Sequence, residues 1–281
     1  RLEAQWVVSA ATDLTRIEIY TNYDRPLDKT QLACVREGIK RRLAGEPLQY
    51  ISGKAAFRRL EFKVRPPVLI PRPETEVLVD GVLEEVKALD RSIGAQDVEP
   101  ERTEPVRILD IGTGSGCIAL SLLHEAHNVK LTATDLNPEA VALAEENAGM
   151  LGLDDPQRLS IVQDDLASSL VENPAFHGSF DIIVSNPPYI PTRELQELPE
   201  EVARYESPLA LDGGEDGLVV FRRIVAQAKL LLKPGALLTC ELHEDTLIAA
   251  KAHSEAEGLV DCLIHNDLTN RPRIITARMP A

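Results

Sequence analysis

The chain has 281 residues and a formal net charge of −15 at pH 7, from 45 acidic and 30 basic side chains. This length allows one large domain, or one domain of ordinary size with a small one. The acidic excess disfavours a nucleic-acid backbone as the main partner, because basic surfaces usually meet phosphates.

The apolar runs and the cysteine spacing bear on the cellular compartment of the protein. No apolar run approaches the ~20 residues of a membrane span, and no signal peptide is recognised. The cysteines form no Cys-x-x-Cys pair and no Cys/His cluster, which predicts free thiols that serve as small core residues. They are Cys34, Cys117, Cys240 and Cys262. We therefore expect a cytoplasmic protein that contacts no membrane and holds no metal.

Residues 1–45 predict a small helical domain. Apolar positions recur at helical spacing from Leu2 to Ala10 and from Leu32 to Leu43, with a turn between the two stretches. The basic cluster Lys40-Arg41-Arg42 suits a helix end, and an RNA or protein contact is the alternative. Such a unit is too small for a rich core, so we expect it to dock on a larger domain or a partner. Because the sequence starts at Arg1 and not at a methionine, we expect this domain to be truncated at its start.

Residues 46–72 predict a linker that contains a short β-hairpin. The stretch from Gln49 to Gly53 and the period-two alternation of Leu60–Val64 indicate its two arms. After the linker, Pro73 is expected to start a helix that reaches about Leu89. The polar stretch Asp90–Pro105 has no periodicity and is predicted to be a mobile loop.

Strands and helices then alternate, which predicts an α/β domain over 73–281. Alternation implies right-handed crossovers and a mostly parallel sheet with helices on both faces. No helix separates the last two strands, so the last strand is predicted to be antiparallel. The expected strands are 106–111, 129–134, 159–163, 180–185, 236–242, 260–264 and 273–278, and the expected helices are 117–126, 138–151, 217–232 and 244–257, with a turn at 233–235.

The first expected strand of this domain ends in a glycine-rich loop, from Asp110 through Gly112 and Gly114 to Gly116. Its glycines permit a tight turn and close approach of a ligand to backbone N–H groups at a helix start. The spacing is Gly-x-Gly-x-Gly and differs from the Gly-x-Gly-x-x-Gly of dinucleotide folds. Asp135 follows the last glycine by 135 − 116 = 19 residues. An acidic residue at about 20 residues reaches ribose hydroxyls in nucleotide-binding sheets, so loop and acid together indicate a nucleoside-containing cofactor.

Two further strand ends carry polar groups. Asp165, or Asp164 beside it, can accept from an exocyclic amine such as that of adenine, and a helix cap is the alternative. The strand 180–185 runs into Asn186-Pro187-Pro188-Tyr189, where the prolines cannot continue a parallel strand. The result is a stiff platform that suits a planar amide or an amino-substituted base edge, unless it is a plain proline-rich turn. Ligands of doubly wound sheets sit at the carboxyl ends of the strands, so we expect these groups to converge.

These motifs together resemble the class I S-adenosylmethionine-dependent methyltransferases that methylate planar nitrogen. The segments Gln49–Gly53 and Leu69–Glu76, the latter reading LIPRPETE, narrow the resemblance to the release factor glutamine N5-methyltransferases, the PrmC/HemK family. It covers nearly the whole chain. The resemblance implies a Rossmann-like methyltransferase sheet, mostly parallel with the last strand antiparallel, behind a small N-terminal helical domain and a β-hairpin linker.

The resemblance also implies site residues, with S-adenosyl-L-methionine as methyl donor and S-adenosyl-L-homocysteine as product. The implied cofactor-binding residues are Gly112, Thr113, Gly114, Ser115, Gly116, Asp135, Asp165, Leu166 and Asn186. The implied catalytic residues are Asn186, Pro187 and Tyr189, and the same three with Pro188 are the implied substrate-binding residues. The family often has an aromatic residue where this chain has Leu166. No glycine follows Glu241 closely, as it does in the family, so that segment receives no role.

The implied substrate is the glutamine of the Gly-Gly-Gln loop of peptide chain release factors, with no direct nucleic-acid contact and a monomeric enzyme. A carboxamide nitrogen is a poor nucleophile because its lone pair is delocalised into the carbonyl. The Asn186 side-chain oxygen and the Pro187 carbonyl are expected to accept its N–H groups, while Tyr189 stacks on the amide plane. This is catalysis by positioning and electrostatic complementarity.

Alternative functions remain at this stage. A nucleic-acid amino-methyltransferase acting on adenine N6 or guanine N2 shares the same tetrapeptide. A glutamine methyltransferase of a ribosomal protein is disfavoured by the LIPRPETE segment, and a non-catalytic binding module is disfavoured by the intact motifs. The acidic stretch Pro191–Glu206 forms either a rim that suits a basic protein loop or a solvated helix face. Arg72 and Glu74 are candidates for shaping the entrance, with an ordinary linker and helix start as the alternative.

Overall fold

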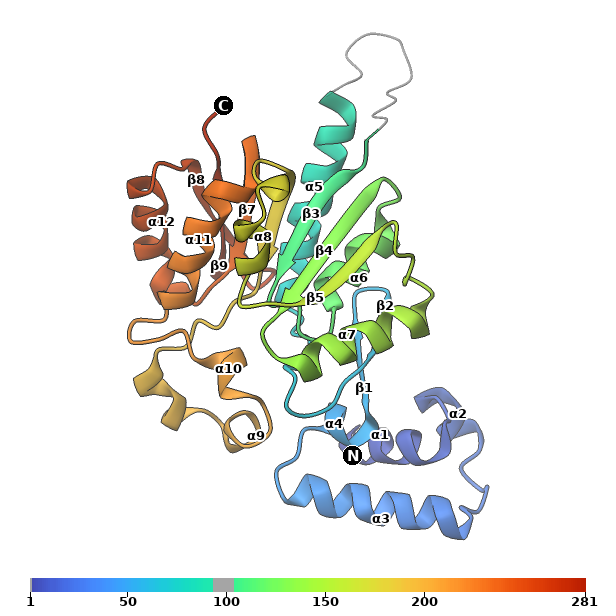
Figure 1. Cartoon of the computed structure of the whole chain (residues 1–281). Helices are drawn as coiled ribbons and strands as arrows, with labels where there is room; N and C mark the ends of the chain where they lie inside the picture. Colours follow the sequence, from blue (N-terminus) through green and yellow to red (C-terminus); the bar gives the residue numbers. More distant parts are fainter. Residues whose placement is uncertain (1, 93–103) are drawn as a thin grey trace.

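The computed structural model describes residues 2–92 and 104–281, and its larger part is built on a seven-stranded sheet (Figure 1). The strand order is β5-β4-β3-β6-β7-β9-β8, and only β9 runs antiparallel to its neighbours. This confirms the predicted α/β sheet with an antiparallel last strand. The strands are β3 Val106–Ile111, β4 Val129–Asp135, β5 Leu159–Gln163, β6 Phe180–Ser185, β7 Leu232–Glu241, β8 Val260–Asn266 and β9 Pro272–Arg278.

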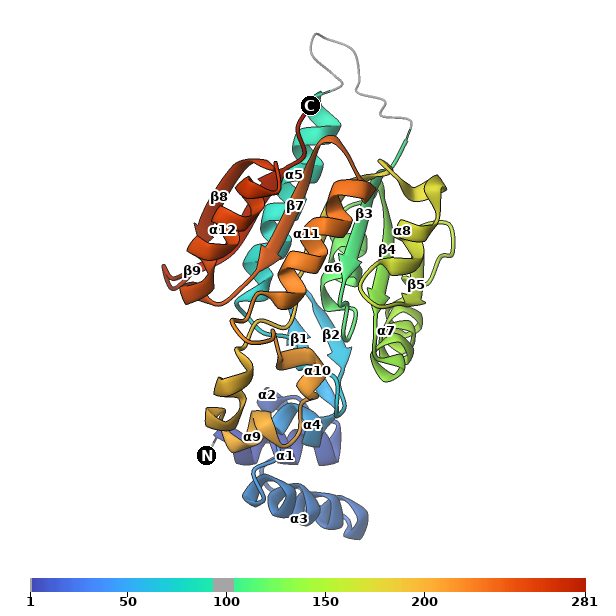
Figure 2. The same cartoon turned by 60° about the vertical axis from the view of Figure 1, so that its left-hand side comes forward.

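Helices cover both faces of this sheet (Figure 2). On one face α5 (Thr75–Ser92), α6 (Cys117–Glu125) and α7 (Pro138–Leu151) pack on side chains such as Ile108 and Ile182. On the other face α8 (Ser168–Glu172), α11 (Val219–Leu231) and α12 (Leu247–Ala256) pack on Leu109 and Ile183. Successive residues of a strand thus enter opposite cores, which explains why the central strands read as continuous apolar runs.

Short helices form the N-terminal unit: α1 Leu2–Thr12, α2 Arg16–Thr21, α3 Lys29–Leu43 and α4 Leu48–Ser52. Capping boxes at Thr15 and Asp28 define the starts of α2 and α3. The hairpin of β1 (Lys54–Phe57) and β2 (Leu60–Lys63) follows. Its side chains Phe57 and Phe62 are buried in the core on the α5 face of the sheet. The hairpin therefore joins the N-terminal unit to the large sheet.

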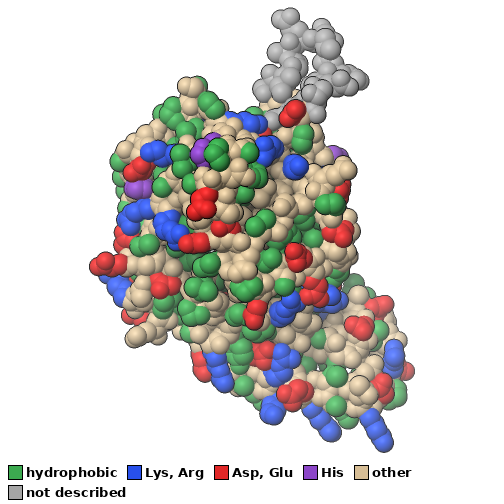
Figure 3. All heavy atoms as spheres, in the orientation of Figure 1, with side chains coloured by type: hydrophobic (Ala, Val, Ile, Leu, Met, Phe, Trp, Pro, Cys, Tyr) green, Lys and Arg blue, Asp and Glu red, His purple; other side chains and the backbone are tan. Residues whose placement is uncertain are grey.

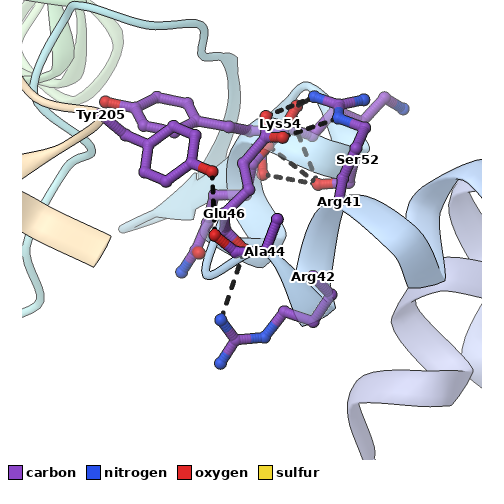
Figure 4. A network of polar contacts seen from close by, with 9 residues as sticks. Arg41, Arg42, Ala44, Glu46, Ser52, Lys54 and Tyr205 are labelled. Atoms are coloured by element: carbon purple, nitrogen blue, oxygen red, sulfur yellow. Dashed lines mark hydrogen bonds and ion pairs between the residues drawn. The ribbon is translucent and has the colours of Figure 1, made fainter. Parts of the chain in front are cut away.

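The chain between β6 and α11 contacts both parts of the molecule. It contains the 3-10 turn η2 (Thr192–Glu197), α9 (Glu200–Ala203) and α10 (Pro208–Leu211). Figure 4 shows its Tyr205 beside the end of α3, where the Tyr205 hydroxyl donates to the Ala44 carbonyl at 3.3 Å. Arg42 also pairs with Glu201 at 3.3 Å. Figures 1 and 2 accordingly show α9 and α10 below the sheet and beside the N-terminal helices.

The basic cluster at the end of α3 is engaged in contacts within the chain. The Arg41 Nε donates to Glu46 at 2.8 Å, and Arg42 pairs with Glu3 at 3.0 Å. These contacts favour the helix-end interpretation for both arginines. Elsewhere on the face seen in Figure 3, acidic and basic side chains are interspersed. Within the described residues, no helix is both long and apolar enough to cross a membrane.

Several expectations about elements are wrong in detail. Residues 48–52 form α4, and the hairpin occupies only Lys54–Lys63, because Gly53 adopts a left-handed conformation (φ 71°) that ends the helix. The helix expected from Pro73 begins at Thr75 and extends to Ser92, so residues 90–92, expected to be loop, are helical. The remainder of that loop, 93–103, lies outside the described residues.

The turn expected at 233–235 lies inside β7. The ladder pairs Phe180 with Leu232 and then Ile182 with Leu237, so the extra residues of β7 form a bulge. Gly235 has φ 73°, which suits such an irregularity. Another correction concerns a cysteine: all four thiols are free, but Cys34 is exposed and is not a core residue.

Candidate active site

A cavity of about 370 Å³ opens at the carboxyl ends of β3, β4 and β6. This volume lies within the range of about 300–1,000 Å³ that is typical of small-molecule pockets. The predicted site residues that line it are Gly112, Thr113, Gly114, Ser115, Asp135, Asp165, Leu166, Asn186 and Pro188. Residues of the segments 67–75 and 207–212 also line it. The predicted convergence of the strand ends is therefore present.

The glycine-rich loop needs its glycines for two different reasons. Gly112 and Gly116 have φ of 75° and 83°, in the left-handed region that favours glycine. A Cβ on Gly112 would meet no described atom within 4 Å, so the space beside it is open. A Cβ on Gly116 would lie 3.1 Å from the Leu120 Cδ1 and 3.2 Å from the Ala144 Cβ. Gly116 therefore serves close packing of α6 against α7 and does not line the cavity.

Asp110 supports the loop from below. Its side chain is fully buried, and its Oδ2 accepts a hydrogen bond from the Thr113 hydroxyl at 2.7 Å. Burial raises the pKa of Asp110 to about 7, and the hydrogen bond from Thr113 opposes that rise. The Oδ1 has no hydrogen-bond partner in the described part of the chain. Asp110 thus fixes the conformation of the loop from inside the core.

Asp135 joins the ends of β3 and β4. Its Oδ2 accepts from the Gly114 N–H at 2.8 Å, and its Oδ1 accepts from the Asn137 N–H at 2.9 Å. Burial raises its pKa, while these two backbone hydrogen bonds oppose the shift. A carboxylate oxygen has two lone pairs, so each oxygen retains capacity for a ligand hydroxyl. Asp135 is consequently placed both to order the loop and to face the cavity.

The structure distinguishes the two aspartates after β5. Asp164 accepts from the backbone and hydroxyl of Ser169, at 2.9 and 2.7 Å, and does not line the cavity among the described residues. Asp165 lines the cavity and pairs with Arg223 at 2.7 Å. Asp164 thus caps an N–H in the first turn of α8, although the N-cap position itself is Ala167. Leu166 also lines the cavity and has φ 58°, an uncommon conformation for a branched side chain.

The Asn186-Pro187-Pro188-Tyr189 segment leaves the sheet directly after β6, as expected. Asn186 and Pro188 line the cavity, whereas Pro187 is buried and Tyr189 packs on the hydrophobic core beside α11. The Tyr189 ring lies 6.4 Å from the His243 ring, centroid to centroid. The structure therefore brings together Asn186 and Pro188 at the cavity and places Pro187 and Tyr189 outside its lining.

Two glycines hold the backbone of this platform. A Cβ on Gly213 would lie 2.7 Å from the Tyr189 Cα, and a Cβ on Gly217 would lie 2.4 Å from the Tyr189 carbonyl oxygen. Ile190 further forms a bridge with Asp212. Only glycine fits such close approach, so the loop 212–217 braces the platform from behind. The Gly-Gly-x-x-Gly spacing of this loop is the feature of the sequence that could have indicated this close approach.

Thr75 and Glu241 are functional candidates that sequence reasoning missed. Asn186 Nδ2 donates to the Thr75 Oγ1 at 3.1 Å, and Thr75 lines the cavity. Glu241 ends β7, next to β6, and its side chain is buried. Burial raises the pKa of Glu241 to about 7, against the hydrogen bonds from Thr75 and Asn186 and the charge of Arg273. Glu241 had two signals in the sequence, an acidic residue at the end of an apolar strand and a family pattern in which a glycine follows that glutamate; the missing glycine left the segment without a role.

Comparisons with known proteins match both parts of the chain. A family model described as PrmC N-terminal domain matches residues 1–53, and one described as methyltransferase small domain matches residues 97–231. The release factor glutamine methyltransferase of Geobacter sulfurreducens is 39% identical over 279 residues, which is 99% of this chain and 89% of that protein. The MTRF1L release factor glutamine methyltransferase of Homo sapiens is 37% identical over 259 residues, 91% of this chain and 74% of that protein.

Solved structures show the fold. The catalytic domain of hMettl16 in complex with a MAT2A 3′UTR hairpin aligns with a TM-score of 0.58 at 16% identity, over 78% of this chain and 74% of that one. A methyltransferase from Pyrococcus furiosus aligns with a TM-score of 0.52 at 17% identity, over 87% of this chain and 100% of that one. At these identities the likeness concerns the sheet and its helices only.

Proposed function

The chain belongs to the release factor glutamine methyltransferases, and we propose that it transfers the methyl group of S-adenosyl-L-methionine to the side-chain amide nitrogen of the glutamine in the Gly-Gly-Gln motif of a peptide chain release factor. The observation that carries this proposal is the cavity itself. It joins the glycine-rich loop, Asp135 and Asn186 in one wall. A methyl donor and a carboxamide acceptor can therefore lie side by side.

The residues of this chain fit an adenosyl compound. Open space beside Gly112 leaves room for a ligand against the loop, and Asp135 has free lone pairs for ribose hydroxyls. Asp165 would accept from the adenine amino group, while its Oδ2 also pairs with Arg223. Leu166 would supply an apolar contact to the base at a position where the family often has an aromatic residue.

S-adenosyl-L-methionine supplies an electrophilic methyl group on a positively charged sulfur. Asn186 then has the central role on the protein side, because its side-chain oxygen would accept one N–H of the substrate carboxamide. With that N–H held, the nitrogen lone pair would point toward the methyl carbon, which lowers the barrier by orientation. The nitrogen would bond to the methyl carbon as the bond from that carbon to sulfur breaks, and it would lose one amide proton to water. Pro187, predicted to accept the other N–H, is buried outside the cavity lining, so this role stays a prediction. Tyr189 supports this geometry from the core side of the platform.

The expected partner is a protein surface. Figures 1 and 2 show α9 and α10 beside the N-terminal helices, and these elements follow the site platform in the chain after η2. The acidic residues of Pro191–Glu206 would favour a basic loop of a release factor. A monomeric enzyme and the absence of direct nucleic-acid contact remain predictions.

Transfer of labelled methyl groups tests the proposed function. The acceptors are a purified release factor, the same factor with its Gly-Gly-Gln glutamine changed to alanine, a DNA duplex and an RNA hairpin. We expect label only on the unaltered factor. Label on either nucleic acid, or equal label on the altered factor, would refute the proposal in favour of an amino-methyltransferase or a different acceptor residue.

A further inference from the structure

We propose that Thr75 and Glu241 fix the orientation of the Asn186 carboxamide, so that Asn186 presents its oxygen, and not its NH2 group, to the substrate amide. This inference rests on the proposed function, because it concerns the side chain that would receive the substrate N–H. Thr75 and Glu241 act through Asn186, so both are positioning residues.

Orientation matters because a carboxamide has two chemically opposite ends. Its oxygen accepts hydrogen bonds, its nitrogen donates two, and the two ends have nearly the same shape. Only the oxygen can accept an N–H from a substrate carboxamide. If Asn186 turned by about 180°, its NH2 group would oppose the substrate NH2 group and repel it. A device that fixes the orientation of Asn186 therefore determines whether the site binds its substrate productively.

The first contact of that device is the hydrogen bond from Asn186 Nδ2 to the Thr75 Oγ1, at 3.1 Å. Thr75 is only 2% exposed, so its hydroxyl cannot exchange freely with solvent partners. Because Thr75 accepts from Asn186, the proton of its own hydroxyl must go to another acceptor. If the Thr75 hydroxyl instead donated its proton to Asn186, the Asn186 oxygen would face Thr75 and its NH2 group would face the substrate.

In the proposed arrangement, Glu241 is that acceptor. In the parallel ladder Ser185 pairs with Cys240, so the next residues, Asn186 and Glu241, leave adjacent strand ends together. The Glu241 side chain interacts with both Thr75 and Asn186, and its Oε2 has no hydrogen-bond partner within the described residues. An ionised carboxylate can only accept. The direction of hydrogen-bond donation is then fixed: Asn186 donates to Thr75, and Thr75 donates to Glu241.

Because Glu241 is buried, it can act on Asn186 only through direct contacts and not as a general surface charge. Glu241 is 2% exposed and does not line the cavity in the described part of the chain, so it does not reach the substrate. A buried carboxylate is retained at an energetic cost unless it makes specific hydrogen bonds. Thr75 comes from the LIPRPETE segment, so the device links that segment to the Asn186 platform across 111 positions of sequence.

Rates of methyl transfer to a purified release factor test the inference, with Glu241→Gln, Thr75→Val and Thr75→Ser. The glutamine introduced by Glu241→Gln can donate as well as accept, and the valine introduced by Thr75→Val keeps the shape of threonine without its oxygen. We expect both variants to lower kcat about 10–100-fold, with little change in KM for the release factor or in S-adenosyl-L-homocysteine affinity by calorimetry. Thr75→Ser keeps the hydroxyl and should restore most of the rate. The double variant Thr75→Val/Glu241→Gln should be no slower than the slower single variant, because both break one chain.

Controls separate this inference from the proposed function. Glu255→Gln makes the same chemical change at an exposed position of α12 and should leave the rate unaltered. If the unaltered enzyme transfers no methyl to the factor, the proposed function fails. If the unaltered enzyme is active and Glu241→Gln and Thr75→Val match it, the inference is overturned. Losses that appear only in KM, additive losses in the double variant, or equal losses for Thr75→Ser and Thr75→Val would overturn it as well.

Discussion

The Arg72 Nη2 lies 2.6 and 2.7 Å from the two carboxylate oxygens of Glu206, which is 134 positions away in the sequence. The Glu206 side chain is 1% exposed, and Arg72 lines the cavity. Burial raises the pKa of Glu206, against the charge and hydrogen bonds of Arg72. The pair connects the linker to the segment whose next residues, 207–212, form part of the cavity wall.

Removing Arg72 should therefore affect both stability and the cavity. Arg72→Ala leaves a buried carboxylate without its partner, and we expect a loss of about 1–3 kcal/mol in the free energy of unfolding. Urea unfolding measures this loss. The double variant Arg72→Ala/Glu206→Gln should regain much of it, because no unpaired charge remains. Equal stability of the single and double variants would show that the pair does not hold this wall.

Asn186→Ala should remove methyl transfer while leaving cofactor affinity nearly intact. The substitution deletes the proposed acceptor for the substrate N–H, and loss of one such positioned group typically lowers kcat about 10²–10³-fold. The rate is measured with the release factor, and the affinity for S-adenosyl-L-homocysteine is measured by calorimetry. If affinity fell in step with the rate, Asn186 would be a cofactor residue and not the substrate acceptor.

The two aspartates after β5 provide a matched comparison. Asp165→Ala should weaken cofactor binding about tenfold, the equivalent of one hydrogen bond to a bound group. Asp164→Ala should leave that affinity unchanged, because the Asp164 side chain bonds only to Ser169 and does not line the cavity in the described structure. It should instead lower stability by about 1 kcal/mol, as other lost caps do. Weaker binding in Asp164→Ala alone would reverse the assignment.

The pH dependence of kcat should report Glu241. Its pKa is raised to about 7, and below that pH a protonated carboxyl can donate to Thr75 and release the fixed polarity. We expect kcat to fall toward acid pH with an apparent pKa near 7 in the unaltered enzyme, and no such limb in Glu241→Gln. The charged groups that face Glu241 are Arg273 and Glu74. Both are unchanged in the variant, as are the nearby Tyr189 and Cys117.

The free energy of unfolding should change with pH in the opposite direction to kcat. The folded pKa of Glu241 lies above the ordinary value of 4.5, so the folded state binds more protons between these two values. The free energy of unfolding therefore decreases as pH rises from about 4.5 to 7 and is level above 7. Thermal unfolding in this window measures the slope, which should be smaller in Glu241→Gln. Asp110, whose pKa is also raised to about 7, contributes equally to both proteins. An identical slope would show that Glu241 does not titrate there.

Local pattern predicted most elements of the large sheet and few of the contacts that complete the site. Apolar runs that end before a glycine, an aspartate or an asparagine gave β3, β5 and β6 with their observed bounds. The contact of Asn186 with Thr75 joins segments 111 residues apart, and Glu241 reaches both only because β7 lies beside β6. Periodicity carries no information on which strands are neighbours. The bulge in β7 was hidden for a related reason, since a lysine, a proline and a glycine in series indicate a turn unless the partner strand is known.

Gly116→Ala should destabilise the protein more than a matched glycine substitution elsewhere. The φ of Gly116 is 83°, and a Cβ there would lie 3.1 Å from Leu120 and 3.2 Å from Ala144. Gly258 has φ 87°, and a Cβ there would meet no described atom within 4 Å. Both variants carry the strain of a left-handed alanine, about 1–2 kcal/mol, so the difference between them isolates the packing of α6 on α7. Urea unfolding measures both. Equal losses in the free energy of unfolding would mean that α6 and α7 accommodate the added Cβ without cost, and that Gly116 is needed only for its backbone conformation.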